Sequence, residues 1–227
     1  MLTLLAEDLL LLLLDDEKGT PPSGVQLPAP LGGALLAELA MAGEVEVEPA
    51  ASRWRRSTVA VTDGAHEDPQ LAQALAVVAE KPRSAQDLVT RLGKNLPDTL
   101  RERLAERGLL ERREGKVLGL FPRTTWPAAD VEHERQVRER LTAVLVQGLT
   151  PDPRTAALAG LLAAVDQAHK VVERGDVPAK QVKKRAKALG EGSEGEWATK
   201  AVRDAIAATT AATTAAITAS TAVAVSS

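Results

Sequence analysis

The stretch "LLAEDLLLLLLDDEKG", residues 4–19, contains six consecutive leucines between two pairs of acidic residues. This apolar run is far shorter than the about 20 residues that span a bilayer. A secretory signal has a positive segment before its apolar run, whereas here Glu7 and Asp8 precede the leucines and Asp15 and Asp16 follow them. Leucine on every face of a helix is typical of a helix buried on all sides. The stretch therefore predicts the central core helix of a globular domain, ending in an Asp-Asp turn.

The composition limits the class of protein. The chain has 227 residues, of which 44% are hydrophobic and 26% charged, a balance typical of one globular domain. It contains no cysteine, which excludes disulfides and thiolate chemistry. Aromatic residues make up only 2%, so a core of Leu, Val and Ala is expected, which favours packed helices. The net charge of -3 produces no strong overall field, so any surface for nucleic acid or membrane has to be local.

Hydrophobic periodicity and turn residues predict a mainly α-helical bundle with a protruding β-hairpin and short strand elements. We expect a strand at 44–48 that pairs with residues from 51–64, and a hairpin that turns at Glu114-Gly115. We divide the chain into a domain over 1–208 and an Ala/Thr-rich, low-complexity tail over 209–227. The predicted helices cover residues 4–14, 31–41, 68–80, 84–92, 97–107, 130–147, 150–172, 177–189 and 194–208.

Residue patterns for catalysis or metal binding are missing from the sequence. The three histidines, His66, His133 and His169, are far apart; the patterns around His66 and His133 are typical of solvent-facing side chains, and we interpret all three as surface or helix-flank residues. None has a partner at the spacing of a helical metal site. Glycine-rich phosphate loops and a nucleophile elbow are also missing. We therefore predict that the protein is not an enzyme and has no cofactor and no metal site.

Basic residues are concentrated in two segments. Residues 81–123 contain eleven Lys or Arg against six Asp or Glu, and residues 180–187 contain five basic residues and no acidic one. Each cluster has two interpretations, a solvated helix face with ion pairs or a surface for polyanions. Their concentration in a slightly acidic chain favours the second. An anionic lipid headgroup and a phosphate backbone both fit this interpretation.

The predicted order of helix, turn, helix and hairpin over residues 84–121 resembles a winged helix. Such a fold suggests DNA binding, which would be salt-sensitive and would use Arg101 and Arg103 on the second helix. Acidic residues on the same helix would repel phosphates, and they are Asp98, Glu102 and Glu106. Nucleic acid is therefore an alternative partner and not our first choice.

Four stretches taken in order resemble the Golgi phosphoprotein 3 family: "LLAEDLLLLLLDDEKG", "LGGALLAELAMAGEVEVE", "LAERGLLERREGKVLGLFPRTTWP" and "DPRTAALAGLLAAVDQAHKVV". The resemblance runs from about Leu4 to Ala208 and includes the Phe-x-x-Thr-Thr-x-Pro motif that begins at Phe121. It implies a mainly helical domain that binds phosphatidylinositol 4-phosphate at a basic pocket, beside a hairpin that contributes to membrane contact and self-association. Eukaryotic members are peripheral Golgi adaptors that retain glycosyltransferases. Frequent Ala and Arg suggest a GC-rich bacterial genome, so we expect a bacterial member, for which a Golgi role would not apply.

The resemblance also assigns the site residues. Ser23 stands near the family's pocket tryptophan, Gly32 replaces an arginine, and Lys94 and Pro97 replace an Arg-x-x-Arg pair. Lys94 alone keeps a charge, so Trp54 or Arg91 would have to substitute for the missing residues. The candidate lipid-headgroup residues are Lys94, Arg91, Arg112 and Arg113, and the candidates for membrane or oligomer contact on the hairpin are Leu118, Leu120 and Phe121.

The expected function is that of a non-enzymatic, phosphatidylinositol 4-phosphate-binding adaptor that is cytoplasmic and peripherally membrane-associated, and at the Golgi only in a eukaryote. Its expected partners are this or another anionic membrane lipid, a second copy of the chain in a homo-oligomer, and a membrane-protein cargo. A winged-helix nucleic-acid binder is one alternative. The other is a protein-protein scaffold that self-associates through its hairpin and loses its oligomer on deletion of residues 111–118.

Overall fold

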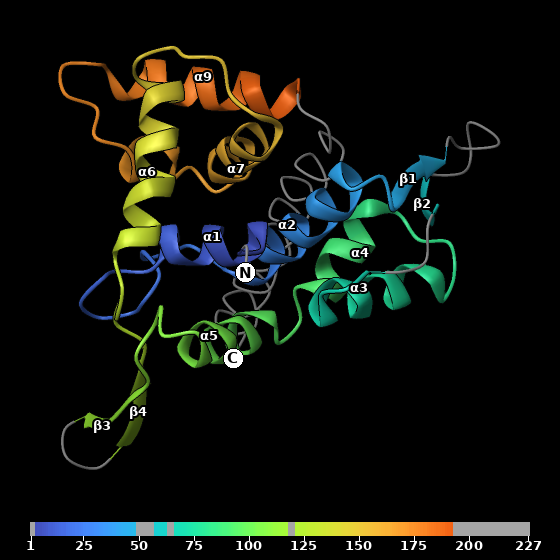
Figure 1. Ribbon diagram of the computed structural model, residues 1–227, viewed down its shortest axis with the longest axis horizontal. Helices are drawn as coiled ribbons and strands as arrows, with labels where there is room; N and C mark the ends of the chain where they lie inside the picture. The colour runs from blue at the N-terminus through green and yellow to red at the C-terminus, as the bar shows by residue number, and fades with distance from the viewer. Residues whose placement is uncertain (1–2, 49–56, 63–65, 118–120, 193–227) are drawn as a thin grey trace, which may run out of the picture.

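The computed structural model describes residues 3–48, 57–62, 66–117 and 121–192. In these ranges the protein is mainly helical and has two small two-stranded antiparallel sheets, which confirms the predicted fold class (Figure 1). The helices are α1 (Leu5–Leu13), α2 (Pro28–Met41), α3 (Pro69–Ala79), α4 (Ala85–Leu92), α5 (Leu96–Glu106), α6 (Glu132–Leu145), α7 (Pro153–Ala164), α8 (Ala168–Val171) and α9 (Ala179–Glu191). The strands are β1 (Val45–Glu48), β2 (Thr58–Val61), β3 (Arg113–Val117) and β4 (Phe121–Thr125), and they pair β1 with β2 and β3 with β4.

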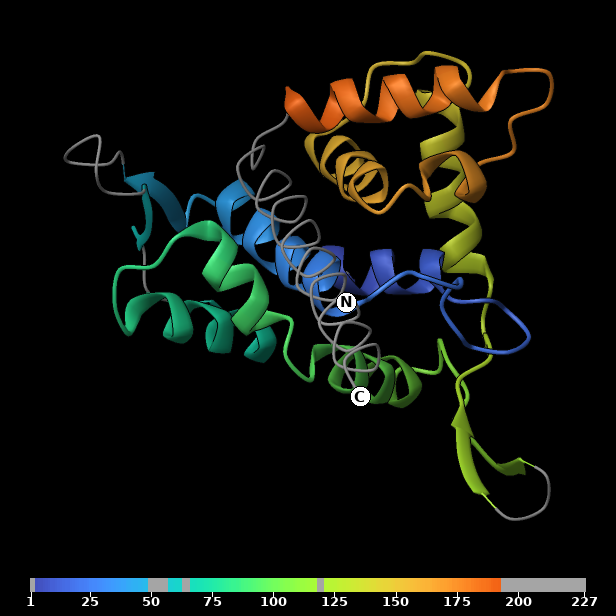
Figure 2. The same cartoon turned by 180° about the vertical axis from the view of Figure 1, so that it is seen from behind.

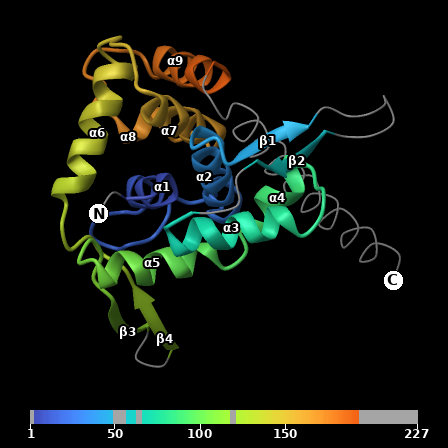
Figure 3. The ribbon, with the colours of Figure 1, turned by 45° about the vertical axis from the view of Figure 1, so that its right-hand side comes forward.

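Helix α1 is the central element of the core. Every residue from Leu5 to Leu13 is buried, and the helix contacts α2, α5, α6 and α7 (Figure 3). It ends at Leu13, and the backbone of the next residue, Leu14, is extended. The Asp15 carboxylate then closes the following turn by accepting a hydrogen bond of 2.8 Å from the Lys18 N–H. The prediction of a core helix that ends in an acidic turn is therefore confirmed.

The β3–β4 hairpin turns later than predicted. Glu114 and Gly115, the predicted turn residues, lie inside β3 and pair with Thr124 and Arg123, and the pairing continues to Val117 and Phe121. The base of the hairpin explains this register. Leu110 is buried and forms an antiparallel bridge with Ala128, in the same register as the strand pairs from Arg113–Thr125 to Val117–Phe121. The packing of Leu110 in the core therefore sets the register of the hairpin, and the Glu114-Gly115 pair does not.

The predicted helix over 150–172 is also wrong, because it is two helices. Helix α7 ends at Ala164, Asp166 adopts a left-handed conformation with φ of 56°, and α8 follows as a single turn. This reversal lets the chain return, so that α9 packs along α7 and also contacts α6 and α8. Seen from the front and from behind, α9 and the β3–β4 hairpin lie at opposite ends of the molecule (Figures 1 and 2). The predicted helix over 194–208 lies outside the described residues, so it and the domain boundary at 208 stay predictions.

Candidate lipid-binding face

Gly32, which the resemblance sets where an arginine was expected, lies where α2 and α4 touch backbone to backbone. A Cβ atom at Gly32 would lie 2.2 Å from the Val89 carbonyl oxygen and 2.7 Å from the Gly93 nitrogen. A Cβ atom at Gly93 would in turn lie 2.0 Å from the Pro28 carbonyl oxygen. Both contacts are far below van der Waals separation, so this packing requires glycine at the two positions. A side chain at position 32 would push the two helices apart, and no arginine fits there.

Lys94 and Arg91 lie at the corner between α4 and α5, and both are exposed. Within the described ranges, the Lys94 side chain makes no hydrogen bond or ion pair, while Arg91 Nε donates to Asp87 Oδ2 over 2.9 Å. An exposed pair four residues apart on a helix contributes only about 0.3–0.5 kcal/mol, so a ligand can displace Asp87 at little cost. Asn95, in the left-handed region with φ of 62°, then starts α5 in a new direction. The corner thus presents two cations to solvent.

Arg112 lies at the base of the hairpin and is held on three sides. Its guanidinium donates to Glu102 Oε1 over 3.3 Å and lies 3.1 Å from Glu114 Oε1. Its central carbon also stands 5.8 Å from the ring centroid of Trp126, a distance that permits a cation–π interaction. About half of the Arg112 side chain is exposed. The residue is therefore oriented by its neighbours but remains accessible.

Arg113 is the first residue of β3, and more than half of its side chain is exposed. Its guanidinium donates to Glu111 Oε2 over 2.6 Å, and this hydrogen bond raises the pKa of Arg113 and lowers the pKa of Glu111. Both groups are therefore charged at neutral pH. Of the predicted apolar contact residues, Phe121 begins β4, although its side chain is not described, and Leu118 and Leu120 lie outside the described residues.

The four candidate headgroup residues form two pairs and not one pocket. Arg91 and Lys94 precede α5, and Arg112 and Arg113 follow it. Helix α5 has 11 residues, which corresponds to a length of about 16 Å. The chain after α5 turns back along it, because Arg112 contacts Glu102 in the middle of this helix, and we call the surface that carries both pairs the α4–hairpin face.

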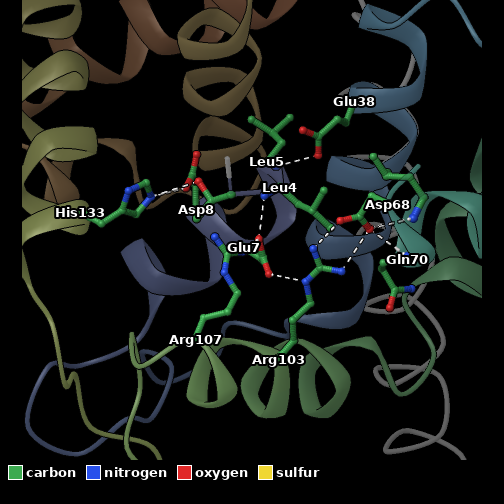
Figure 4. Close-up of polar contacts among 12 residues, drawn as sticks. Leu4, Leu5, Glu7, Asp8, Glu38, Asp68, Gln70, Arg103, Arg107 and His133 are labelled. Atoms are coloured by element: carbon green, nitrogen blue, oxygen red, sulfur yellow. Dashed lines mark hydrogen bonds and ion pairs between the residues drawn. The ribbon is translucent and has the colours of Figure 1, made fainter. Parts of the chain in front are cut away.

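A buried set of charges, which we call the α1 ionic cluster, was not predicted from the sequence (Figure 4). Its centre is Glu7, which is fully buried in the first turns of α1. The Glu7 carboxylate accepts hydrogen bonds of 2.8 Å from Arg103 and from Arg107, and one of 2.7 Å from the Leu4 N–H. The cluster consists of Glu7, Asp8, Glu38, Asp68, Arg103, Arg107, His133 and Arg154.

Asp8, next to Glu7, anchors α6 and α7 to α1. Its Oδ1 lies 2.7 Å from His133 Nε2, and its Oδ2 accepts from Arg154 Nη2 over 2.9 Å. Arg154 also donates to Glu38 Oε1 over 2.7 Å and to the Thr3 carbonyl over 2.6 Å. Burial raises the pKa of Glu38, and Arg154 offsets part of this effect. Burial disfavours the charge on Arg154, yet Asp8 and Glu38 raise its pKa above the ordinary value.

Two predictions are corrected by this cluster. His133 is not solvent-facing, because its ring contacts Asp8 and Thr3. Arg103, an expected DNA contact, is only 19% exposed and pairs with Glu7 and Asp68. Arg101, the other expected DNA contact, is 16% exposed and donates to the neighbouring Asp98. Both arginines expected to contact DNA are therefore mostly buried and already paired with carboxylates of the protein.

One signal in the sequence could have revealed the cluster. A helix predicted to be buried on every side carries Glu7 and Asp8 in its first turns. Buried carboxylates need charged or hydrogen-bonding partners, because desolvation of an isolated charge is costly. The cations that supply them lie about 100 or more residues away in the sequence, so the pattern could indicate their existence but not their identity.

The described residues form a mainly helical domain with two small hairpins, and they contain no group of three or more His, Cys, Asp or Glu side chains that could hold a metal ion. The sequence matches the family model of Golgi phosphoprotein 3 (GPP34) over residues 5–209, and the chain belongs to this family. The family is non-catalytic. No curated protein matches the chain. Among the described helices, none is both long and apolar enough to cross a membrane.

Proposed function

We propose that the protein is a non-catalytic peripheral membrane protein that binds anionic lipid, and phosphatidylinositol 4-phosphate in particular, through the α4–hairpin face. The family supports the lipid class, because membership implies a phosphatidylinositol 4-phosphate-binding role. The observation that carries the proposal is Lys94, an exposed cation without a side-chain partner in the described residues, at the position that resembles a family pocket arginine. The bacterial origin inferred from composition stays a prediction.

The chemistry of the face favours binding by charge over recognition of one headgroup. Lysine is a point charge and lacks the planar fork with which arginine reads a phosphate, and Gly32 leaves no room for the second family cation. Near an anionic membrane each well-placed basic residue contributes about 1 kcal/mol. We therefore expect salt-sensitive binding with a modest preference for phosphatidylinositol 4-phosphate over other lipids of equal charge.

Vesicle co-sedimentation at physiological salt tests this function. Vesicles with phosphatidylinositol 4-phosphate are compared with phosphatidylserine vesicles of equal total charge and with neutral phosphatidylcholine vesicles. We expect binding to both anionic preparations, and loss of most of it in the variant Arg91→Glu/Lys94→Glu. A double variant with the same change of net charge, Lys180→Glu/Lys184→Glu on α9, should bind as the wild type does. Equal binding to neutral and anionic vesicles, or no binding at all, would show that the proposed function is wrong.

The hairpin supports self-association as a second activity. Strands β3 and β4 pair only with each other among the described residues, so each leaves one edge with unpaired backbone groups. Exposed strand edges are templates for pairing with another chain. Light scattering across a concentration series tests this: we expect an oligomer that is lost when residues 115–123, which form a register-matched part of the hairpin, are replaced by Gly-Gly. A monomer at every concentration would contradict it.

A further inference from the structure

Helix α9 carries the second basic cluster, and three of its lysines form one stripe. Lys180, Lys184 and Lys187 are all exposed and follow the spacing i, i+4, i+7, which places them on one face of the helix. The opposite face carries Val182 and Ala186, which are fully buried. We call these three residues the α9 lysine stripe.

The other two cations of α9 have structural roles that the stripe lacks. Lys183 pairs with Asp166 over 2.8 Å, which ties α9 to the reversal after α7. Arg185 donates to the carbonyl oxygens of Leu145 and Val146 at the end of α6, over 3.0 and 2.7 Å. Within the described residues, the stripe makes one contact with an acidic group, in which Lys187 stands 3.8 Å from Glu191. An ion pair accounts for Lys183 and hydrogen bonds to backbone carbonyls account for Arg185, but neither kind of contact accounts for the whole stripe.

The stability of α9 does not explain the stripe either. Lys180 lies in the first turn of α9, where the positive end of the helix dipole disfavours a cation, and Glu191 lies at the last position, where an anion is disfavoured. No side chain caps the N-terminus. Like charges four residues apart, such as Lys180 and Lys184, also destabilise a helix by a few tenths of a kcal/mol. This charge distribution destabilises the helix. An anionic partner bound to the lysines would offset that destabilisation.

The position of α9 indicates which kind of anion is the partner. Helix α9 lies at the end of the molecule opposite the β3–β4 hairpin, in the front and rear views and in the turned view (Figures 1, 2 and 3). A flat bilayer in contact with the hairpin therefore leaves α9 facing away from the membrane. A partner that reaches α9 in this orientation is a molecule in solution and not the same bilayer.

We propose that the α9 lysine stripe is a docking surface for an acidic segment of a partner protein. From Lys180 to Lys187 the stripe extends about 11 Å along the helix, which matches three to four extended residues. Lysine ammonium groups recognise charge without demanding a fixed geometry, so the segment is defined by consecutive carboxylates. The choice of a protein over a bilayer rests on the proposed function, because that function sets the orientation of the protein on the membrane. The conclusion that the partner is anionic does not rest on the proposed function.

Fluorescence anisotropy with a labelled peptide of eight glutamates tests the proposal on the full chain. We expect binding that weakens with salt and that falls at least tenfold in the variant Lys180→Glu/Lys184→Glu/Lys187→Glu. The matched control is Arg91→Glu/Lys94→Glu/Arg113→Glu, which changes the net charge by the same amount and should bind the peptide as the wild type does. Circular dichroism and thermal unfolding confirm that both variants are folded.

Three results would overturn the proposal. One is an equal loss of peptide binding in both variants, which would mean that only total charge matters. Another is tighter, α9-dependent binding of a 20-base-pair DNA duplex than of the peptide. The third is loss of vesicle binding in the α9 variant but not in its control, which would place the bilayer on α9 and refute the α4–hairpin face as well. Peptide binding through α9 without any vesicle binding would uphold the docking surface and reject only the proposed lipid function.

Discussion

The α1 ionic cluster and the α9 lysine stripe use the same kinds of charge in opposite ways. In the cluster, Arg103 and Arg154 each bind two carboxylates and lie largely inside the protein. In the stripe, three lysines point away from the helix face that packs on the domain. The comparison teaches that the number of basic residues in a segment does not reveal a binding surface. What decides is whether the fold supplies each cation with an acidic partner.

The largest effect that this comparison predicts is on Arg154. In Arg154→Ala, Asp8 and Glu38 remain buried without their shared cation, and removing one partner of a buried ion pair costs about 3 kcal/mol or more. Urea denaturation measures the change in the free energy of unfolding. The control Lys184→Ala, in the stripe, should change it by less than about 0.5 kcal/mol. Similar losses in both variants would remove the distinction between the two regions.

A second prediction concerns the close backbone contact between α2 and α4 at Gly32. The variant Gly32→Ala places a Cβ atom 2.2 Å from the Val89 carbonyl oxygen, and forcing helices apart in a packed core costs about 1–3 kcal/mol. Thermal unfolding should show a clearly lower Tm, while Gly192→Ala, with its nearest neighbouring atom at 3.7 Å, should leave Tm nearly unchanged. An unaltered Tm in Gly32→Ala would mean that position 32 has room for a side chain after all.

The cluster should also shape the pH dependence of stability. Burial pushes the pKa of Asp68 upward, but hydrogen bonds from Arg103 and the Gln70 N–H outweigh this and lower it below 3.8. The unfolded chain therefore binds the proton first, and this part of the stability is present above about pH 5 and lost as the pH falls through the lowered pKa. Asp68→Asn should flatten the fall in the free energy of unfolding between about pH 5 and pH 3, as measured by urea titration at each pH.

The pKa of Glu38 is shifted in the opposite direction, and this provides a check on the Asp68 result. Its pKa is raised above 4.5 by burial, so its contribution is present below the unfolded pKa and is lost as the pH rises through the folded pKa. In the wild type, the free energy of unfolding should therefore decrease as the pH rises above about 4.5, and Glu38→Gln should abolish this decrease. If Asp68→Asn and Glu38→Gln change the pH profile in the same direction, the two carboxyls do not have the environments described above.

The smallest predicted effect uses His169 as a reporter of the field around α9. Burial lowers the pKa of His169, and so do the nearby charges of Lys183, Lys170 and Arg174, while Asp166 raises it. An acidic peptide on α9 should offset these cations and raise the pKa of His169, which an NMR titration of the imidazole signals measures. The imidazole signals of His66, which lies beside Glu44, serve as the control and should not respond to the peptide. Equal shifts of both histidines would indicate a nonspecific effect of the peptide.

Much of this protein could be predicted from local sequence. The leucine run of 9–14 predicts the core helix because leucine on all faces has to be buried, and the prolines at 69 and 97 predict helix starts because proline fits the first turn. The order of α4, α5 and the β3–β4 hairpin also follows from helix-capping and turn residues that are local in the sequence. The family itself was recognisable from the order of these short stretches.

The tertiary structure alone decided the features that depend on contacts between distant segments. The hairpin register follows from the pairing of Leu110 with Ala128, and the break after α7 follows from Asp166, which carries no breaker signal in the sequence. Arg103 and Lys184 are both basic residues on amphipathic helices, but Arg103 meets Glu7, 96 positions away. A side chain's charge is a property of the sequence, whereas its desolvation and pairing are properties of the fold, and these determine whether the charge stabilises the core or remains available to a partner.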